Sequence, residues 1–334
     1  MRLVILGAGK LLIHILKNVD FSVYKLINIF VSDVQRNKDI VYLRENNFPV
    51  DTEKIETSRF KSIIKNLQPD VILCIGVREI ISKETISIPT IGIVNLHGAL
   101  LPYQRGAGGD YGGVINDKIL GLSTHFMDEG IDSGPIIYSD YFKIKNGDSK
   151  EEMIAKSFDI TPRIIKKSLE LILDESFKPK TQEKYCYYPR KPDWDEYIDW
   201  TETSQLLYDK IRARNPGCLN FTIHNGEILF IFKAEMVDFI KSYIAPCGQV
   251  IGNIKNKGVL VKTGDTALLL TEVAYGDISL TINRSKYPYD IPENIFVPKF
   301  RISSMLGVNI YKEYFSLLDR VTILEQKIDK INKE

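Results

Sequence analysis

The first half of the chain alternates short apolar runs with segments long enough for a helix. The runs are Arg2–Leu6, Leu26–Val31, Val71–Ile75, Thr90–Asn95 and Leu122–Phe126. Continuous apolar runs of this length are typical of strands that are buried on both faces of a parallel sheet. They predict a Rossmann-like open α/β domain over residues 1–184. Ser149 and Glu152 predict a capping box that opens a helix, broken near Pro162 and ending at about Asp174.

The sequence changes character after residue 184. Residues 185–202 hold prolines and many aromatic side chains, which predict an extended linker rather than a helix. A predicted helix at 203–214 is followed by strand patterns, and Asn225-Gly226 between two of them favours a type I′ hairpin turn. Further strands are predicted at 258–262, 266–273 and 278–282. We therefore expect a small β-barrel domain over residues 203–300.

Residues 301–334 are predicted to form a C-terminal helix. Apolar residues recur there four and three positions apart in turn, at Ile310, Tyr314, Leu317, Val321, Leu324, Ile328 and Ile331. Heptads of this kind are typical of helices that form coiled coils. They predict a homodimer formed through this helix, with packing of the apolar stripe on the same chain as the alternative.

Charge and cysteine content argue against several classes of protein. Lys and Arg number 44 against 43 Asp and Glu, a net charge of +1, whereas proteins that bind nucleic acid usually carry a basic excess. The four cysteines form no C-x-x-C pair, so no metal site is predicted. No apolar stretch has the length of a signal peptide or a membrane helix. We expect a cytoplasmic protein with neither a nucleic-acid nor a membrane partner.

Gly7 and Gly9 follow the first apolar run and are a weak nucleotide-binding signal. The dinucleotide motif needs a third glycine where Leu12 stands, although Asp33 could supply the acidic residue expected further along. The pattern therefore favours an ordinary tight turn between strand and helix over a NAD(P) site.

A stronger motif begins with Asn95 and His97 at the end of the fourth run. Side chains two apart on a strand share a face, and open α/β sheets bind ligands at the carboxyl ends of their strands. An amide and an imidazole aimed at one point can stabilise an oxyanion and move a proton. Asp132, on a glycine-flanked loop about 35 residues later, could orient the imidazole or share the proton transfer. No serine or cysteine nucleophile is indicated, which favours direct attack by a substrate amine on an acyl donor.

Residues 95–106 and 128–137 resemble the signature of the formyltransferases that use 10-formyltetrahydrofolate. This family includes methionyl-tRNA formyltransferase and the nucleotide-sugar N-formyltransferases. Residues 71–81 resemble its pterin-binding strand and loop, and stretches between 198 and 273 resemble its OB-like C-terminal domain. The resemblance covers roughly residues 1–285 and implies a formyltransferase fold followed by an OB-like barrel.

The resemblance also implies roles for individual residues. Asn95, His97 and Asp132 would form a catalytic triad in which Asn95 and His97 stabilise the oxyanion, and His97 and Asp132 divide the proton transfer between them. The donor, 10-formyltetrahydrofolate, would lie in a pocket lined by Gly76, Val77, Arg78, Ile80 and Asp128.

The acceptor is predicted from less specific features. The glycine-rich stretch at 106–109 resembles some sugar-modifying members, and the low net charge favours a small acceptor that carries phosphate. Arg105 and Arg190 are candidates to bind a diphosphate, and Tyr187 or Trp194 to contact a base or sugar; packing between domains is the alternative for Arg190 and the aromatic residues. The expected substrate-binding residues are Tyr103, Arg105, Gly106, Tyr187 and Arg190.

Three hypotheses follow. The favoured one is transfer of a formyl group to the amino group of a dTDP- or UDP-linked amino-deoxysugar for surface-polysaccharide synthesis. The alternative is formylation of methionyl-tRNA. The third is a non-catalytic module that binds a dinucleotide or folate. The sequence leaves open which sugar and nucleotide are used and where the amine lies.

Overall fold

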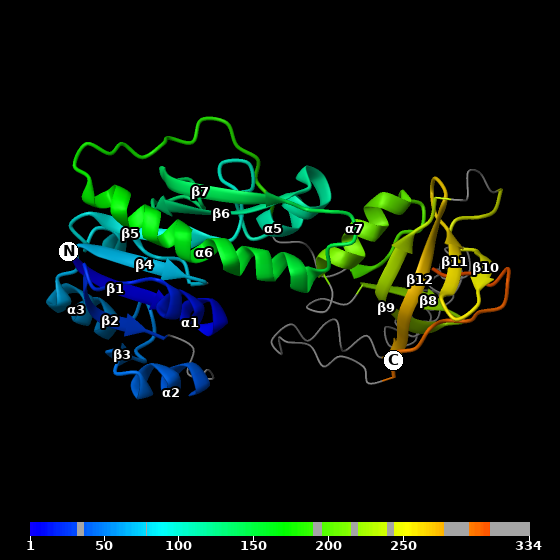
Figure 1. Cartoon of the computed structure of the whole chain (residues 1–334), viewed down its shortest axis with the longest axis horizontal. Coiled ribbons are helices and arrows are strands. Elements are labelled where there is room, and N and C mark those ends of the chain that lie inside the picture. Colours follow the sequence, from blue (N-terminus) through cyan, green and yellow to red (C-terminus); the bar gives the residue numbers. More distant parts are fainter. Residues whose placement is uncertain are drawn as a thin grey trace, which may run out of the picture. The chain divides into compact units, whose positions relative to one another are not determined.

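The computed structural model describes residues 1–31, 37–77, 79–189, 196–214, 220–238, 244–276 and 294–307. The chain divides into two compact units, Met1–Lys191 and Pro192–Glu334, and each is built on its own sheet (Figure 1). Several predictions fall outside the described residues: those for Asp33, Arg78, Arg190, Trp194, the strand at 278–282 and the heptad helix.

The N-terminal unit contains a seven-stranded sheet in the order β3-β2-β1-β4-β5-β6-β7. Its strands are β1 (Arg2–Gly7), β2 (Lys25–Phe30), β3 (Val50–Asp51), β4 (Val71–Ile75), β5 (Gly92–His97), β6 (Ile119–Phe126) and β7 (Ile136–Lys143). The expected open α/β fold is confirmed. The expectation of a wholly parallel sheet is wrong, because β6 runs antiparallel to β5 and β7 antiparallel to β6. The segment between β5 and β6 forms a loop and two short helical turns, and it lacks the crossover helix that a parallel return needs.

Helices cover both faces of this sheet. They are α1 (Gly9–Asn18), α2 (Asn37–Glu45), α3 (Ser58–Leu67), α4 (Lys83–Ile86) and α6 (Lys150–Leu173). Leu3 and Ile5 of β1 pack in one apolar cluster with side chains of α1, α2 and α6, whereas Val4 and Leu6 pack in another with α3 and α4. The period-two alternation of a strand thus gives two cores, and α6 lies along β6 and β7 (Figure 1).

The capping box of α6 is confirmed, since the Ser149 hydroxyl accepts from the Glu152 N–H and the Glu152 carboxylate accepts from the Ser149 N–H. The predicted break near Pro162 is wrong, because the helix continues to Leu173. Pro162 lacks the N–H that would bond to the Phe158 carbonyl. His14 of α1 lies 3.0 Å from that carbonyl and donates to it through Nε2. This partner from another helix satisfies the carbonyl that proline leaves free.

The C-terminal unit contains helix α7 (Ser204–Arg214) and a five-stranded antiparallel sheet in the order β10-β11-β12-β9-β8. The strands are β8 (Asn220–His224), β9 (Glu227–Met236), β10 (Val250–Ile254), β11 (Gly258–Lys262) and β12 (Ala267–Gly276). Asn225 and Gly226 join β8 to β9 with φ values of 54° and 87°. Positive φ at both central residues is what a type I′ turn requires, so the predicted hairpin is confirmed.

Residues 303–307 join the two edges of this second sheet. Leu306 bridges His224 at the end of β8, and Met305 bridges Gln249 just before β10. The Val250 N–H bonds to the Ser304 carbonyl at 2.8 Å, and the Gly307 N–H bonds to the carbonyl of Ile223 at 2.7 Å. The sheet is thereby closed into a barrel that extends to Gly307, beyond residue 300, where the sequence pattern placed its end.

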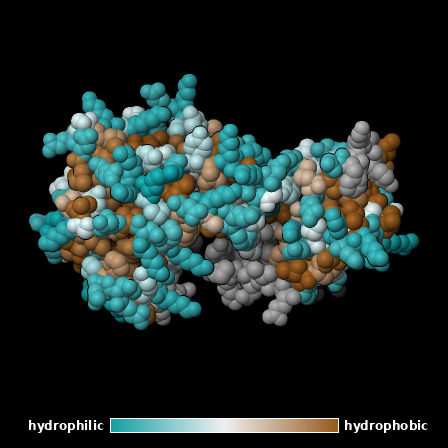
Figure 2. All heavy atoms as spheres, in the orientation of Figure 1, coloured by the Kyte–Doolittle hydropathy of each residue, from teal (hydrophilic) through white to brown (hydrophobic). Residues whose placement is uncertain are grey.

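Over the part of the chain that the structure describes, no helix is long and apolar enough to cross a membrane. Figure 2 shows hydrophilic residues spread over the visible face of both units, with apolar residues in smaller groups between them.

Candidate active site

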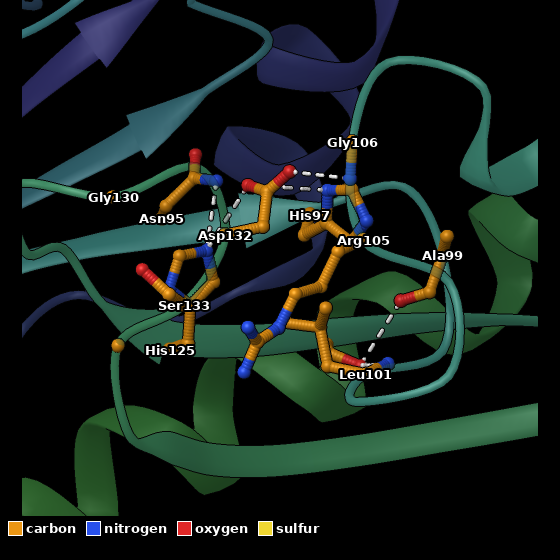
Figure 3. Close-up of polar contacts among 12 residues, drawn as sticks. Asn95, His97, Ala99, Leu101, Arg105, Gly106, His125, Gly130, Asp132 and Ser133 are labelled. Atoms are coloured by element: carbon orange, nitrogen blue, oxygen red, sulfur yellow. Dashed lines mark hydrogen bonds and ion pairs between the residues drawn. The ribbon is translucent and has the colours of Figure 1, made fainter. Parts of the chain in front are cut away.

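Two neighbouring strands place the functional side chains on one face of the sheet. Asn95 and His97 lie on β5, and their partners in the antiparallel register on β6 are His125 and Ser123. The loop after β6 carries Asp132, which turns back toward both strands (Figure 3). Direct cross-strand neighbours and residues two apart share a face, so the register itself brings these groups together.

Asp132 lies between two histidines. Its Oδ1 is 3.5 Å from His97 Nδ1 and 3.5 Å from His125 Nε2, while its Oδ2 accepts the Gly106 N–H at 3.0 Å (Figure 3). Asn95 Nδ2 is 3.1 Å from His125 Nε2. The structure therefore groups Asn95, His97 and Asp132 and adds His125, which the sequence analysis missed. The available signal was a histidine within an apolar strand, seven residues before Asp132.

Burial and charge set the protonation of this group. Burial lowers the pKa of His97 below its usual 6.5, against the opposing effects of the Asp132 charge and the Gln104 carbonyl. Burial alone would raise the pKa of Asp132. The hydrogen bond from His125, the charge of His97 and the Gly106 N–H outweigh it and bring that pKa to about 2. Near neutral pH the site therefore holds an anionic Asp132 beside a neutral His97.

A backbone carbonyl fixes the tautomer of His97. His97 Nε2 lies 2.7 Å from the Gln104 carbonyl and donates to it, which leaves Nδ1 as the proton-accepting nitrogen. The Gln104 side chain is 1% exposed and holds its own loop, accepting the Leu100 N–H at 2.9 Å and donating to Asp117 at 2.7 Å. The neutral imidazole thus presents a lone pair toward Asp132.

Gln182 and Arg105 hold the loop that carries Asp132. Asp132 has a φ of 51°, in the left-handed region that most side chains avoid. Gln182 Nε2 donates to the carbonyls of Asp132 at 3.0 Å and Gly134 at 2.6 Å. Arg105 Nε donates to Gln182 Oε1 at 2.9 Å, and its guanidinium lies 4.0 Å from the ring centroid of Tyr185. Neither Gln182 nor Tyr185 was predicted, because their contacts span about 50 to 80 residues of chain.

Comparison with known proteins assigns the chain to a family. The family described as "Formyl transferase" matches residues 28–169, and "Formyl transferase, C-terminal domain" matches residues 192–281. A methionyl-tRNA formyltransferase of Fusobacterium nucleatum is 30% identical over 284 residues, which cover 81% of this chain and 91% of the relative. The chain belongs to the formyltransferase family. Another methionyl-tRNA formyltransferase, from Clostridium tetani, is 32% identical over 70% of this chain and 76% of its own.

Solved structures show the same fold in more distant proteins. An N-formyltransferase from Helicobacter canadensis, solved with folinic acid and dTDP-3-aminofucose, has a TM-score of 0.60 at 18% identity and covers 80% of this chain and 98% of its own. HypX from Aquifex aeolicus, in complex with tetrahydrofolic acid, has a TM-score of 0.56 at 15% identity over 91% of this chain and 50% of its own. These likenesses confirm the predicted formyltransferase fold.

The comparisons correct the favoured functional hypothesis. The favoured hypothesis was formylation of a nucleotide-linked amino sugar. It is contradicted by relatives at about 30% identity, which are methionyl-tRNA formyltransferases and align with this chain over most of their length. The low net charge was wrongly taken to favour a small acceptor, because net charge is a sum over the whole chain and does not show where the cations lie. Phosphate contacts depend on where the cations lie, so a net charge of +1 does not exclude a local RNA-binding face.

The glycine-rich stretch of this formyltransferase has a structural cause. Residues 185–189 run beside it, with Tyr187 bridging Arg105. A Cβ atom at Gly106 would lie 2.6 Å from the Tyr188 carbonyl oxygen, and one at Gly108 would lie 2.6 Å from that of Pro189. Both distances are too short for a side chain. The glycines therefore leave room for residues 185–189 to pack against them, and they give no information about the acceptor.

The predicted acceptor residues of the formyltransferase differ in placement. Tyr103 and Tyr187 are about half exposed, whereas Arg105 is 6% exposed. The Arg105 guanidinium is already used by Gln182 and Tyr185, so its position suits the support of the Asp132 loop rather than contact with a diphosphate.

The predicted donor residues lie beyond the carboxyl end of β4. Gly76 has a φ of 66°, and a Cβ there would meet no atom within 4 Å. Ile80 is 89% exposed and Val77 is partly buried. The Gly76 backbone thus faces open space and Ile80 is exposed, while the donor pocket expected from these residues stays a prediction. Asp128 instead shapes its own loop, accepting from the Gly130 N–H at 3.0 Å and the Ser133 hydroxyl at 2.7 Å.

The start of the sheet favours the ordinary-turn interpretation of Gly7 and Gly9. The Gly9 N–H, at the N-terminus of α1, donates to Asp39 Oδ2 at 2.7 Å. A carboxylate thus lies where a dinucleotide would place its pyrophosphate. Among the described residues, no group of three or more His, Cys, Asp and Glu side chains is placed to hold a metal ion. Family membership confirms the prediction of 10-formyltetrahydrofolate as the formyl donor.

Proposed function

We propose that this formyltransferase transfers the formyl group of 10-formyltetrahydrofolate to the amino group of methionyl-tRNA in the cytoplasm. The observation that carries the proposal is the 30% identity to a methionyl-tRNA formyltransferase across 91% of that relative. Both the catalytic unit and the C-terminal unit are included in the family match. An RNA acceptor replaces the small acceptor that the sequence analysis favoured.

The geometry supports direct attack by the amine. Asn95 has an amide N–H available near the end of β5, and we assign it to the formyl oxygen, where negative charge develops as the amine adds. His97 Nδ1 carries the lone pair that can take the proton from the attacking amine. Asp132, 3.5 Å from that nitrogen, stabilises the imidazolium that results. As the bond between the formyl carbon and N10 of the donor breaks, the proton held by His97 passes to N10, and tetrahydrofolate leaves.

The donor is proposed to bind at the carboxyl ends of β4 and β5. Gly76 and Val77 would meet the polar edge of the pterin through backbone groups, and Ile80 would cover its apolar face. Gly98 also borders open space, since a Cβ there would meet no atom within 4 Å. This space adjoins His97, which would bring the formyl carbon close to the imidazole.

The test is formylation of methionyl-tRNA by the purified chain, with donor consumption followed by absorbance and product by mass. Wild type should turn over, and His97→Asn should lose transfer by about 10²-fold or more while it still binds the donor. His14→Asn is the matched control, because His14 bonds to Phe158 on α6 and lies outside the site. Transfer to a dTDP-linked amino sugar but not to methionyl-tRNA would overturn the proposed acceptor. Full activity of His97→Asn would overturn the mechanism.

A further inference from the structure

Ser123 is buried beside the site, and the proposed mechanism does not use it. It lies on β6 as the register partner of His97 on β5, and its side chain is 0% exposed. A hydroxyl group removed from water needs hydrogen-bond partners inside the protein. The partners of this one indicate which part of the site it holds.

The Ser123 hydroxyl makes three contacts. It accepts the Leu101 N–H at 2.9 Å and donates to the Ala99 carbonyl at 3.0 Å, while the Ser139 hydroxyl donates to it at 2.8 Å. Ala99 and Leu101 both belong to the loop that follows β5 (Figure 3). A backbone N–H only donates and a carbonyl only accepts, so these roles do not depend on any titration. One side chain thus fixes both neighbours of Leu100.

Leu100 passes this constraint on to Gln104. Its N–H donates to the side-chain oxygen of Gln104 at 2.9 Å, and its carbonyl accepts the Gln104 N–H at 3.0 Å. Ala99 and Leu101 are buried, so their polar groups would lack water as a replacement partner if the Ser123 hydroxyl were removed. The loop would then have to move to satisfy them, and Gln104 would move with it.

The next contact along this loop reaches the catalytic imidazole. The Gln104 carbonyl accepts from His97 Nε2 at 2.7 Å. Because a carbonyl only accepts, Nε2 carries a proton whether the ring is neutral or charged. In the neutral ring this contact keeps the proton on Nε2 and off Nδ1, which is the nitrogen that must take the proton of the attacking amine. A displaced carbonyl would remove that preference.

We propose that Ser123 is a positioning residue for formyl transfer: by holding Ala99 and Leu101, it places the Gln104 carbonyl where that carbonyl keeps the His97 proton on Nε2. The inference rests on the proposed function, which makes His97 the base. Ser123 is fully buried and does not itself contact the donor or the acceptor. Its effect should therefore fall on the chemical step rather than on the binding of substrates.

Ser123→Ala removes both loop contacts, and Ser139→Ala is its matched control. The control is the same substitution at the register partner on β7, and it removes one contact between hydroxyls while both bonds from Ser123 to the loop remain. Ser123→Ala should lower kcat by about 10–100-fold, with the KM for the donor changed by less than about threefold. Ser139→Ala should lower kcat by less than about threefold. Unchanged kcat in Ser123→Ala, or equal losses in the two variants, would overturn the inference.

The pH dependence of kcat separates an effect on His97 from a general loss of structure. Burial lowers the pKa of His97, and the hydrogen bond to the Gln104 carbonyl raises it. The charged or titratable neighbours that also act on the ring stay in place in Ser123→Ala; they are Asp132, Asp110 and His125. The acid limb of the kcat profile should therefore move to lower pH in Ser123→Ala and keep its position in Ser139→Ala. A lower kcat with an unmoved acid limb would overturn the inference.

A double-mutant cycle with His97 tests whether Ser123 acts through the imidazole. In a His97→Asn background, Ser123→Ala should change the residual kcat by less than about twofold, because the ring that the loop orients is gone. Losses that multiply in the double variant would show that Ser123 acts through another group and would overturn the inference. Thermal unfolding of each variant, measured in parallel, gives the folded fraction by which each kcat is corrected.

An acceptor-independent measurement keeps this inference distinct from the proposed function. The chain has four histidines, so the His97 signals in ¹⁵N-histidine spectra can be assigned with His97→Asn. Nε2 of His97 should be protonated in wild type, and its resonance should shift in Ser123→Ala but not in Ser139→Ala. An unshifted resonance in Ser123→Ala would overturn the inference whatever the activity. The expected spectra with no formylation of methionyl-tRNA by wild type would overturn the proposed acceptor alone.

Discussion

Gln182 joins the Arg105 side chain to the Asp132 loop, and its replacement by methionine tests that link. Methionine has nearly the same shape but cannot hydrogen-bond, so the change removes contacts without opening a large cavity. Gln182 gives two hydrogen bonds to the carbonyls of Asp132 and Gly134 and accepts one from the charged Arg105. Two neutral bonds at about 1 kcal/mol each and one charged bond at about 2 kcal/mol predict a loss of about 4 kcal/mol in unfolding free energy.

The same substitution should lower activity through geometry. Asp132 adopts a φ of 51°, which only its surroundings maintain, and without Gln182 the loop can relax toward a more favourable backbone conformation. A displacement of about 1 Å at a catalytic carboxylate can cost about 10²-fold in rate. We therefore expect kcat for formyl transfer to fall by about 10–100-fold.

The assays are thermal unfolding of the full chain followed by circular dichroism, and steady-state kinetics. For a unit of this size, about 4 kcal/mol corresponds to a fall in Tm of roughly 8–16 °C. Glu183→Met is the matched control, because Glu183 is the exposed neighbour. A Gln182→Met protein with unchanged Tm and kcat would refute the argument that this side chain holds the Asp132 loop.

The other predictions concern pH, the barrel and assembly. The kcat for transfer should fall as pH drops through the His97 pKa, below 6.5, because a protonated ring cannot accept a proton. In Asp132→Asn the remaining activity should fall at a lower pH, because the Asp132 charge that raises the His97 pKa is gone. The Asp132 carboxylate should stabilise the fold above pH 3.8, an effect lost as pH falls toward its pKa of about 2. Leu306→Ala should cost about 2–5 kcal/mol, read by tryptophan fluorescence, since both tryptophans lie in the C-terminal unit. Deletion of residues 308–334 should halve the mass seen by light scattering if the heptads form a homodimer.

Each of these predictions has an outcome that contradicts it. An acid limb at higher pH in Asp132→Asn would reverse the assigned effect of that carboxylate on His97. If wild type and Asp132→Asn differed in stability by the same amount at pH 2 and pH 6, the pH-dependent stabilisation assigned to the Asp132 carboxylate would be contradicted. Unchanged tryptophan unfolding in Leu306→Ala would mean that the 303–307 segment is not needed for the barrel. Unchanged mass after the deletion would favour a helix that packs on its own chain.

Sequence patterns correctly predicted the features that depend on neighbouring residues alone. Apolar runs located most strands, Ser149 and Glu152 located the start of α6, and Asn225-Gly226 located a hairpin. The errors arose where a distant partner decides the outcome. Pro162 does not break α6 because His14 satisfies the carbonyl that it frees, and no local pattern contains that partner.

The same division applies to the site. Asn95 and His97 were predicted because their spacing on one strand is visible in the sequence. His125 and Gln182 were not predicted. His125 joins the site through the pairing of β5 with β6, and Gln182 through a contact 50 residues away along the chain, and neither can be read from a local pattern. The acceptor was misjudged because net charge contains no positional information. The glycine-rich stretch misled for a similar reason, since the segment that requires it lies some 80 residues away.

The closure of the barrel by residues 303–307 has a consequence for synthesis of the chain on the ribosome. Ile198 already bonds to β8 at Phe221, but the His224 end of β8 and the start of β10 pair with this last described segment only after it has been made and released from the exit tunnel. Until then the nascent C-terminal unit lacks the pairing of residues 303–307 with the start of β10 and the His224 end of β8, and open backbone groups on a strand edge are templates for association with other chains. Premature termination before residue 303 should therefore give an aggregation-prone product, even though all five strands are present.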